Sequence, residues 1–389
     1  MATPTISLDR TDPYRPPATH VQLQEDAPIS WVRRPDGREL WVLTRHEDVR
    51  TMLGDPRFSS DRSDPRHPSH QPYMGADHRP SLIEMDPPDH TRLRRSVVGE
   101  FTVQRLAAWR PRIQEIVDAT IDDMLAAGSE ADLVEALSLP VPSAVIAELL
   151  GVPYADHEFF QKNSSEFVRS DATPEERGAA VGRLKSYMAA LVEGKIKAPG
   201  DDLLSRRITA GADPEEVAAL GFLLLIAGHE TTANMISLSV ATLLDKREHL
   251  AQLREDSNLT VGAVEELLRY FTIAEVGTAR LALEDIEIGG TLIRAGQSVL
   301  GLSNTANRDP YVFPEPDELD FTRMARNHLA FGFGPHQCLG QNLARLELEI
   351  VLATLLRRVP TLRLAVPFKE IPFKEKGPNY GVFELKVAW

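Results

Sequence analysis

The chain of 389 residues contains one cysteine, Cys338, and this single thiol limits what can hold its fold together. One cysteine cannot form an intrachain disulfide, and it excludes every site built from a cluster of cysteines. Hydrophobic residues make up 42% of the chain and charged residues 26%, which is ordinary for a globular protein. The fold must therefore rest on a large hydrophobic core, and length alone would suggest two or three domains of about 150 residues.

The formal net charge of −14 at pH 7 argues against a general nucleic-acid binder, because phosphates would be repelled. The opening MATPTISLDRTDPYRPP lacks a basic segment followed by an apolar one, so it does not resemble a secretory signal. The longest nearly continuous apolar run, 217–228, is shorter than the roughly 20 residues that span a bilayer. We therefore expect a cytoplasmic protein without a membrane segment.

Hydrophobic periodicity predicts a mainly α-helical chain with small β-sheets. A hairpin is expected over 29–43 around a Pro-Asp-Gly turn, a further β segment over 286–299, and a strand over 382–387. The remaining periodic segments predict helices over 103–126, 142–151, 156–169, 175–194, 261–270 and 339–358.

Two further helices are expected from their capping residues. Thr44 and Glu47 have the spacing of a capping box, which predicts a short helix directly after the first hairpin. Asp213 followed by Pro214 predicts the start of a long central helix that ends near Leu244. By contrast, 55–89 is rich in proline and reads as a long loop, either a lid over a site or a surface loop.

Familiar catalytic motifs are incomplete. The zinc-protease pattern H-E-x-x-H begins at His46, His157 and His229, but each time the second histidine is missing. The chain has no phosphate-binding loop of the type G-x-x-x-x-G-K-[ST] and no G-x-S-x-G nucleophile turn. The sequence therefore gives no support for a zinc protease, a phosphate-loop nucleotide hydrolase or a serine hydrolase.

The cysteine lies in the segment FGFGPHQCLG, residues 331–340, directly before the helix expected over 339–358. Taken alone, a single cysteine is most often a small buried apolar residue. Here two glycines and a proline predict a tight turn with exposed amides, and the following helix dipole favours a thiolate. Gly340 lets a flat partner approach the backbone. A thiolate in such a loop suits haem iron.

FGFGPHQCLG resembles the haem-binding loop of the cytochrome P-450 monooxygenases, and other segments resemble that family's motifs in the same order along nearly the whole chain. These are DPPDHTRLRR at 86–95, AGHETT at 227–232, ELLR at 266–269, ANRDP at 306–310 and LDFTR at 319–323. The match is strongest to the soluble bacterial branch. The resemblance implies the family's mainly α, triangular fold, a single domain over 1–389 with haem b between the long central helix and the cysteine loop.

The resemblance also implies a role for each matching residue. Cys338 would be the axial thiolate ligand of the iron, in a cofactor-binding loop that begins at Phe331. Glu230 would relay protons, and Thr231 would hydrogen-bond the dioxygen that the iron activates; from the residues alone, a satisfied core pair stays open. The cationic partners of the haem propionates would be His90, Arg94, Arg280 and His336.

Neighbouring residues are given other roles. Gly228 would leave room for oxygen, and His229 is assigned to the helix surface or the pocket rim. Glu266 and Arg269, with Arg323, are interpreted as structural, because in the family they lock the fold around the cysteine loop.

Without a flavin or nicotinamide domain, such a chain needs electrons from a ferredoxin and a ferredoxin reductase. Residues 90–112 carry six arginines against Glu100, which would steer an acidic partner or is simply a solvated helix face. The resemblance implies a monomer that inserts oxygen from O2 into a medium-to-large apolar small molecule, by hydroxylation or epoxidation. A peroxide-driven oxidase on the same fold and a non-catalytic haem sensor remain alternatives.

Overall fold

The computed structural model describes residues 3–70, 80–168, 173–274, 278–376 and 379–389. It divides into two compact units. Unit 1 comprises 1–93, 238–341 and 369–383, and unit 2 comprises 94–237, 342–368 and 384–389. Over the described residues the fold is mainly helical with small sheets, as the periodicity predicts.

Unit 1 is built around a five-stranded sheet with the strand order β1-β2-β8-β5-β3. The expected hairpin forms its edge, with Ile29 opposite Leu43 and Arg33 opposite Glu39. β8 joins β2 in parallel, whereas β5 pairs antiparallel with both β8 and β3. The strands are β1 (Ile29–Arg33), β2 (Glu39–Leu43), β3 (Phe58–Ser59), β5 (Ala279–Ala282) and β8 (Ser298–Gly301), beside the small hairpin β6 (Ile286–Ile288) and β7 (Thr291–Ile293).

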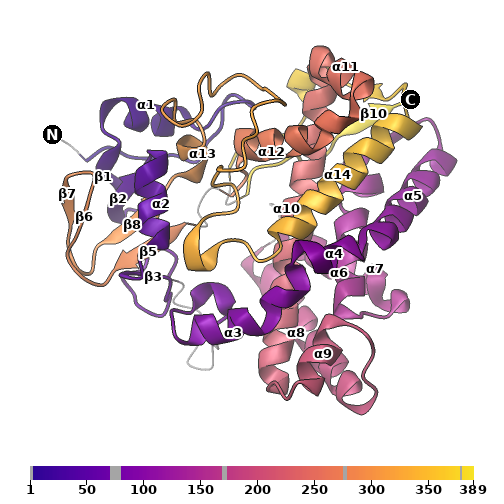
Figure 1. The fold of residues 1–389 in the computed structure, drawn as a ribbon, viewed down its shortest axis with the longest axis horizontal. Coiled ribbons are helices and arrows are strands. Elements are labelled where there is room, and N and C mark those ends of the chain that lie inside the picture. The colour runs from indigo at the N-terminus through magenta and orange to yellow at the C-terminus, as the bar shows by residue number, and fades with distance from the viewer. Residues whose placement is uncertain (1–2, 71–79, 169–172, 275–277, 377–378) are drawn as a thin grey trace. The chain divides into compact units, whose positions relative to one another are not determined.

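One face of this sheet is covered by α2 (His46–Gly54), whose Val49, Met52 and Leu53 are buried with Leu43 and Val299 (Figure 1). The other helices of this unit are α1 (Ala18–Asp26), α11 (Arg247–Glu255), α12 (Thr260–Phe271) and α13 (Ser303–Ala306). The expected capping box is wrong, because the Thr44 hydroxyl donates to the Pro28 carbonyl at 3.0 Å and the helix begins at His46.

The Glu266–Arg269 pair lies in α12 and is fully buried, as expected of a structural pair. The Glu266 carboxylate accepts from Arg269 Nε at 2.8 Å and from Arg269 Nη2 at 2.7 Å. It also accepts from Arg323 Nε at 3.1 Å and from the Asp320 amide at 3.0 Å. Arg269 in turn donates to the Asn307 and Pro316 carbonyls at 2.8 and 2.9 Å. This network ties α12 to the segment that leads to the cysteine loop.

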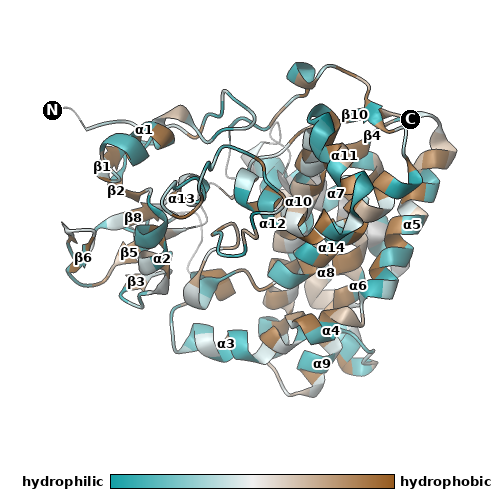
Figure 2. Ribbon diagram, turned by 45° about the horizontal axis from the view of Figure 1, so that its top comes forward, coloured by the Kyte–Doolittle hydropathy of each residue, from teal (hydrophilic) through white to brown (hydrophobic). Residues whose placement is uncertain are grey.

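Unit 2 is mainly helical, and α14 shows both polar and apolar patches along its length (Figure 2). Its helices are α4 (Val103–Ala107), α5 (Arg110–Ala127), α6 (Pro140–Leu150), α7 (His157–Val168), α8 (Pro174–Lys197), α9 (Leu203–Thr209) and α14 (Gln341–Arg358). The one helix expected over 103–126 is two, because Pro111 in the first turn of α5 has no N–H to continue α4. The antiparallel sheet β4-β10-β9 consists of β4 (Glu130–Asp132), β9 (Arg363–Leu364) and β10 (Lys386–Ala388). The strand expected over 382–387 thus starts later.

Two helices cross the boundary between the units: α3 (Asp89–Val97) and α10 (Pro214–Asp245). The predicted ends of α10 are confirmed to within one residue, and Asp213 Oδ1 accepts from the Glu215 amide at 3.3 Å. By length and composition this helix could cross a membrane, but 56% of its most apolar window is buried inside the protein. Core helices of soluble proteins pass the same test, so the composition of α10 is weak evidence for a membrane span.

Candidate haem site

The cysteine loop of unit 1 is a tight turn closed by backbone hydrogen bonds. The Cys338 amide donates to the Phe331 carbonyl at 2.8 Å, and the Gln337 amide donates to the Gly334 carbonyl at 3.0 Å. Between them the chain makes the 3-10 turn η6 (Gly334–His336), and α14 begins three residues after the cysteine. Cys338 is exposed. The expected turn and the following helix are confirmed.

Glycine is required in this loop by both backbone angle and space. Gly332 and Gly334 have φ values of +67° and +71°, which side-chain-bearing residues rarely adopt. A Cβ on Gly334 would also lie 2.5 Å from the Leu53 carbonyl oxygen. The loop therefore packs directly against the end of α2, and the packing holds Cys338 at a fixed point of the unit.

Polar contacts anchor the residues just before the loop. The Leu329 amide donates to Asn307 Oδ1 at 2.7 Å. The His328 ring lies 3.1 Å from Glu265 in α12, measured from Nε2 to Oε2. On the loop itself, Arg50 lies over the Phe333 ring, with Cζ 4.4 Å from the ring centroid. The cysteine loop is thus held by α2, α12 and the Asn307 segment, all within unit 1.

Two of the expected propionate partners meet in unit 1. The rings of His90 in α3 and His336 in η6 lie 4.0 Å apart between centroids. His90 is buried, and Arg94 follows four residues later on the same face of α3. Because His336 is two residues from Cys338, the contact places the start of α3 beside the cysteine loop.

Arg280 lies in β5 and is only 7% exposed. Burial, reinforced by the positive charge of Arg62, lowers the pKa of Arg280 to about 10, and Asp86 opposes the shift. Among the described residues, the Ala279 carbonyl, 2.7 Å from Nη1, is the hydrogen-bond acceptor of this guanidinium. A buried cation with so few acceptors fits a carboxylate-bearing cofactor, and together with the Cys338 thiol this donor set fits haem.

The expected catalytic pair lies in the middle of α10, within unit 2. The Thr231 hydroxyl donates to the Ala227 carbonyl at 2.8 Å, the local bond that threonine often forms in a helix. Glu230 and Thr231 are both partly exposed, although the apolar run 217–228 precedes them closely in the sequence. The pair is thus accessible rather than packed into a core.

Two neighbouring assignments need correction. His229 is 2% exposed, so it lies in the interior and not at the helix surface. A Cβ on Gly228 would lie 3.4 Å from Ile146 Cδ1 in α6. The missing side chain of Gly228 therefore leaves space that Ile146 fills. The expectation that this glycine makes room for oxygen is wrong.

Part of the proline-rich loop is firmly tied to the sheet of unit 1. Ser59 donates from its hydroxyl to Asp86, and the Ser60 amide donates to Asp86 Oδ1 at 2.8 Å. Ser298 in β8 donates from its hydroxyl to the Arg66 carbonyl. Residues 59–66 are therefore not a floppy surface loop, whereas 71–79 lie outside the described residues.

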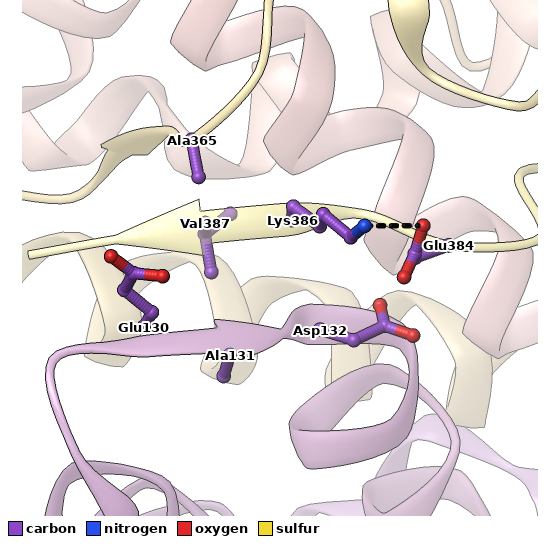
Figure 3. Close-up of a pocket in the computed structure, with 7 residues that line it drawn as sticks. All are labelled: Glu130, Ala131, Asp132, Ala365, Glu384, Lys386 and Val387. Carbon is purple, nitrogen blue, oxygen red and sulfur yellow. Dashed lines mark ion pairs between the residues drawn. The ribbon is translucent and has the colours of Figure 1, made fainter.

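Sequence reasoning missed Arg62 and His67, the two basic residues beside Arg280. Their proline-rich segment has no helical or strand periodicity, so burial could not be predicted there. A pocket of about 230 Å³ lies at the β4-β10-β9 sheet of unit 2 (Figure 3). None of the expected site residues lines it. Its lining residues are Glu130, Ala131, Asp132, Ala365, Glu384, Lys386 and Val387.

Comparison with known proteins agrees with this geometry. The family profile described as Cytochrome P450 matches residues 185–382. Over 388 residues the chain is 50% identical to pentalenic acid synthase of Streptomyces avermitilis, covering 98% of this chain and 96% of that one. It is 48% identical over 396 residues to vitamin D3 dihydroxylase of Streptomyces griseolus, covering 99% and 97%.

Solved structures show the same fold. The crystal structure of cytochrome P450 MoxA from Nonomuraea recticatena superposes with a TM-score of 0.94 at 50% identity, covering 100% of this chain and 99% of that one. The mycinamicin VIII C21 methyl hydroxylase MycCI of Micromonospora griseorubida, solved with mycinamicin VIII bound, gives a TM-score of 0.92 at 40% identity, covering 100% of both chains. The mainly helical architecture with small sheets is confirmed.

Proposed function

The chain belongs to the cytochrome P450 family of haem-dependent monooxygenases, and from this premise we propose which residues serve the reaction, which molecules it oxidises and how electrons reach it. The observation that carries the proposal is Cys338, exposed on a glycine-shaped loop immediately before α14. Cys338 would bind the iron of haem b, and Arg94, Arg280, His90 and His336 would pair with its carboxylates. That 1–389 form one domain around one haem stays our proposal.

The bound haem would supply the activation of O2, and the chain would control protons and access. Thr231 Oγ1 already donates its proton to Ala227, so its lone pairs are left to accept a hydrogen bond from a protonated group. Glu230, the adjacent acid, would deliver protons as a general acid. The Cys338 amide is engaged with Phe331, which would hold the sulfur in place.

We propose a medium-to-large, largely apolar small molecule of secondary metabolism or a xenobiotic as the substrate. The relatives named for pentalenic acid and vitamin D3, and the structure with mycinamicin VIII bound, support this class. The segments expected to shape the pocket are 60–88, 156–194, 273–277 and the loop around Asn379. Of these, residues 71–79, 169–172, 275–277 and 377–378 lie outside the described residues. We further propose that the protein works in the cytoplasm as a monomer.

For electron transfer we propose a ferredoxin and its reductase, docking on the exposed arginines of α3. Three of the six arginines in 90–112 are already paired within unit 2. Arg110 lies 2.8 Å from Glu349, and Arg112 pairs with Glu148. Arg105 lies 3.4 Å from Glu100. Arg92, which lies 4.0 Å from Asp89, and Arg95 are exposed, which supports a docking patch smaller than the sequence suggests.

The test of function combines a ligand screen with labelled oxygen. We expect the purified haem protein to shift from low to high spin with its substrate, and the product to carry one atom from ¹⁸O₂ when a ferredoxin, its reductase and NAD(P)H are present. Label appearing only from H₂¹⁸O₂ would instead establish the peroxide-driven alternative. A spin shift without any product under either condition would favour a haem-binding sensor.

The role of Thr231 is tested by Thr231→Ala with Thr232→Ala as its matched control. Both hydroxyls donate to a carbonyl four residues earlier, at 2.8 Å to Ala227 and 3.2 Å to Gly228, but Thr232 is buried. We expect Thr231→Ala to keep haem and substrate binding while product per NAD(P)H falls several-fold and hydrogen peroxide rises. Thr232→Ala should stay near wild type. Equal coupling in the two variants would remove Thr231 from the mechanism.

A further inference from the structure

Beside Arg280, unit 1 holds two further basic side chains, one buried and one partly buried. His67 is 1% exposed, and the Arg62 side chain is 27% exposed. The strand register explains their position, because Ser59 pairs with Leu281 and the chain after Ser59 therefore runs alongside Arg280. The three basic side chains thus come together through strand pairing.

The charges in this cluster repel one another. Burial and the charges of Arg62 and Arg280 lower the pKa of His67 to about 4. Burial also lowers the pKa of Arg62, which Glu84 opposes from 4.0 Å. Two further acids lie nearby: Asp61 raises the pKa of His67, and Asp86, which also accepts hydrogen bonds from Ser59 and Ser60, raises the pKa of Arg280. At both guanidinium groups, burial outweighs the effect of these acids on the pKa, and the two like charges lie close together, which favours an added anion.

The cluster also contains buried hydrogen-bond donors. His67 Nδ1 accepts from the Ser69 amide at 3.1 Å, so the proton of the neutral ring lies on Nε2. Among the described residues, the buried Arg62 Nε has no hydrogen-bond partner. His67 Nε2 lies beside the Ala279 backbone, which raises the pKa of His67, but no well-formed hydrogen bond satisfies this nitrogen. Donors buried in this way are costly unless an oxygen ligand satisfies them.

We propose that Arg62 and His67 join Arg280 in one cradle that binds a carboxylate of the haem. Asp86 connects the cradle to the cysteine loop, because its carbonyl accepts from the His90 amide at 3.0 Å and the His90 ring contacts His336. The inference rests on the proposed function and deepens it. Arg62 and His67 are positioning residues, since they act on the cofactor's carboxylate and not on the reacting atoms.

The test compares Arg62→Gln with Arg66→Gln, which removes an exposed guanidinium that pairs with Asp64 at 2.6 Å in the same segment. We expect haem transfer from Arg62→Gln to apomyoglobin to be about tenfold faster than from wild type, as for the loss of one charge-assisted hydrogen bond. Its reduction potential should fall, because a positive charge beside the haem is lost. Arg62→Lys should retain the potential, and Arg66→Gln should match wild type in both measurements.

Equal haem transfer and equal potential in Arg62→Gln and Arg66→Gln would overturn the cradle. The cradle would also be overturned if Arg62→Gln bound a carboxylate-bearing ligand more weakly in the spin-shift titration while its haem transfer stayed unchanged. The carboxylate that Arg62 binds would then belong to the substrate. If Arg62→Gln does not accumulate, His67→Asn serves in the haem-transfer assay, with the same expected direction. Because the His67 ring is neutral, this variant should keep the potential of wild type. Failure of the proposed function would be seen separately, as a wild-type protein without a red-shifted Soret band in the reduced, CO-bound state.

Discussion

Replacement of Cys338 by serine is expected to abolish the strongly red-shifted Soret band of the reduced, CO-bound protein and to reduce monooxygenase turnover to background. A thiolate pushes electron density to haem iron and promotes cleavage of the O–O bond, and a serine hydroxyl does not. The chain has no other cysteine that could substitute. The measurement is the reduced CO difference spectrum, with product formation followed in parallel.

Cys338→His separates the loss of the thiolate from the loss of the cofactor. Histidine is a common axial ligand of haem, so this variant should retain haem while it lacks the red-shifted band. Circular dichroism would show whether the glycine-shaped loop and α14 survive in both variants. A red-shifted band that persists in Cys338→Ser would disprove the assignment of the ligand.

Glu266→Gln is expected to cost about 3–5 kcal/mol of unfolding free energy, because it removes the charge that balances Arg269 in a fully buried network. The carboxylate accepts four hydrogen bonds, two from Arg269, one from Arg323 and one from the Asp320 amide. A loss of this size is a large fraction of the roughly 5–15 kcal/mol that typically stabilises a protein. Chemical unfolding followed by circular dichroism measures it, and the yield of haem-loaded protein should fall as well.

The control is Glu115→Gln, which breaks an ion pair of the same i,i+3 spacing at the surface. Arg112 and Glu115 lie 2.7 Å apart, but their side chains are 50% and 64% exposed. Such a pair is worth about 0–1 kcal/mol, so the variant should unfold nearly as wild type does. If the two substitutions lower the free energy of unfolding equally, burial does not determine how much the Glu266 network stabilises the fold.

The sequence predicted best where local chemistry decides the structure. Asp213 and Pro214 define the start of α10, since a side-chain cap and a fixed φ act within one turn. The turn at the cysteine was predictable for the same reason, because the two glycines before Cys338 permit positive φ. Local signals thus predicted the turn that carries Cys338, the proposed iron ligand, and the helix α10 that carries the proposed catalytic pair.

Prediction was weaker where a distant partner competes for a residue. Thr44 has the correct spacing for a capping box, but its hydroxyl bonds the Pro28 carbonyl across the hairpin instead. His229 reads as a polar residue for a helix surface, yet it is buried in the interior. Arg62 and His67 are placed by the pairing of β3 with β5, which no local pattern encodes. Tertiary contacts therefore decided these residues.

The contact between Gly334 and the end of α2 limits how such a chain can be diversified. Any side chain at this position would meet the Leu53 carbonyl and could be accommodated only if α2 moved away. Random libraries that include this loop would therefore mostly yield proteins that cannot hold their cofactor, whatever their substrate. New specificities should be selected from libraries that leave both surfaces of this contact unaltered.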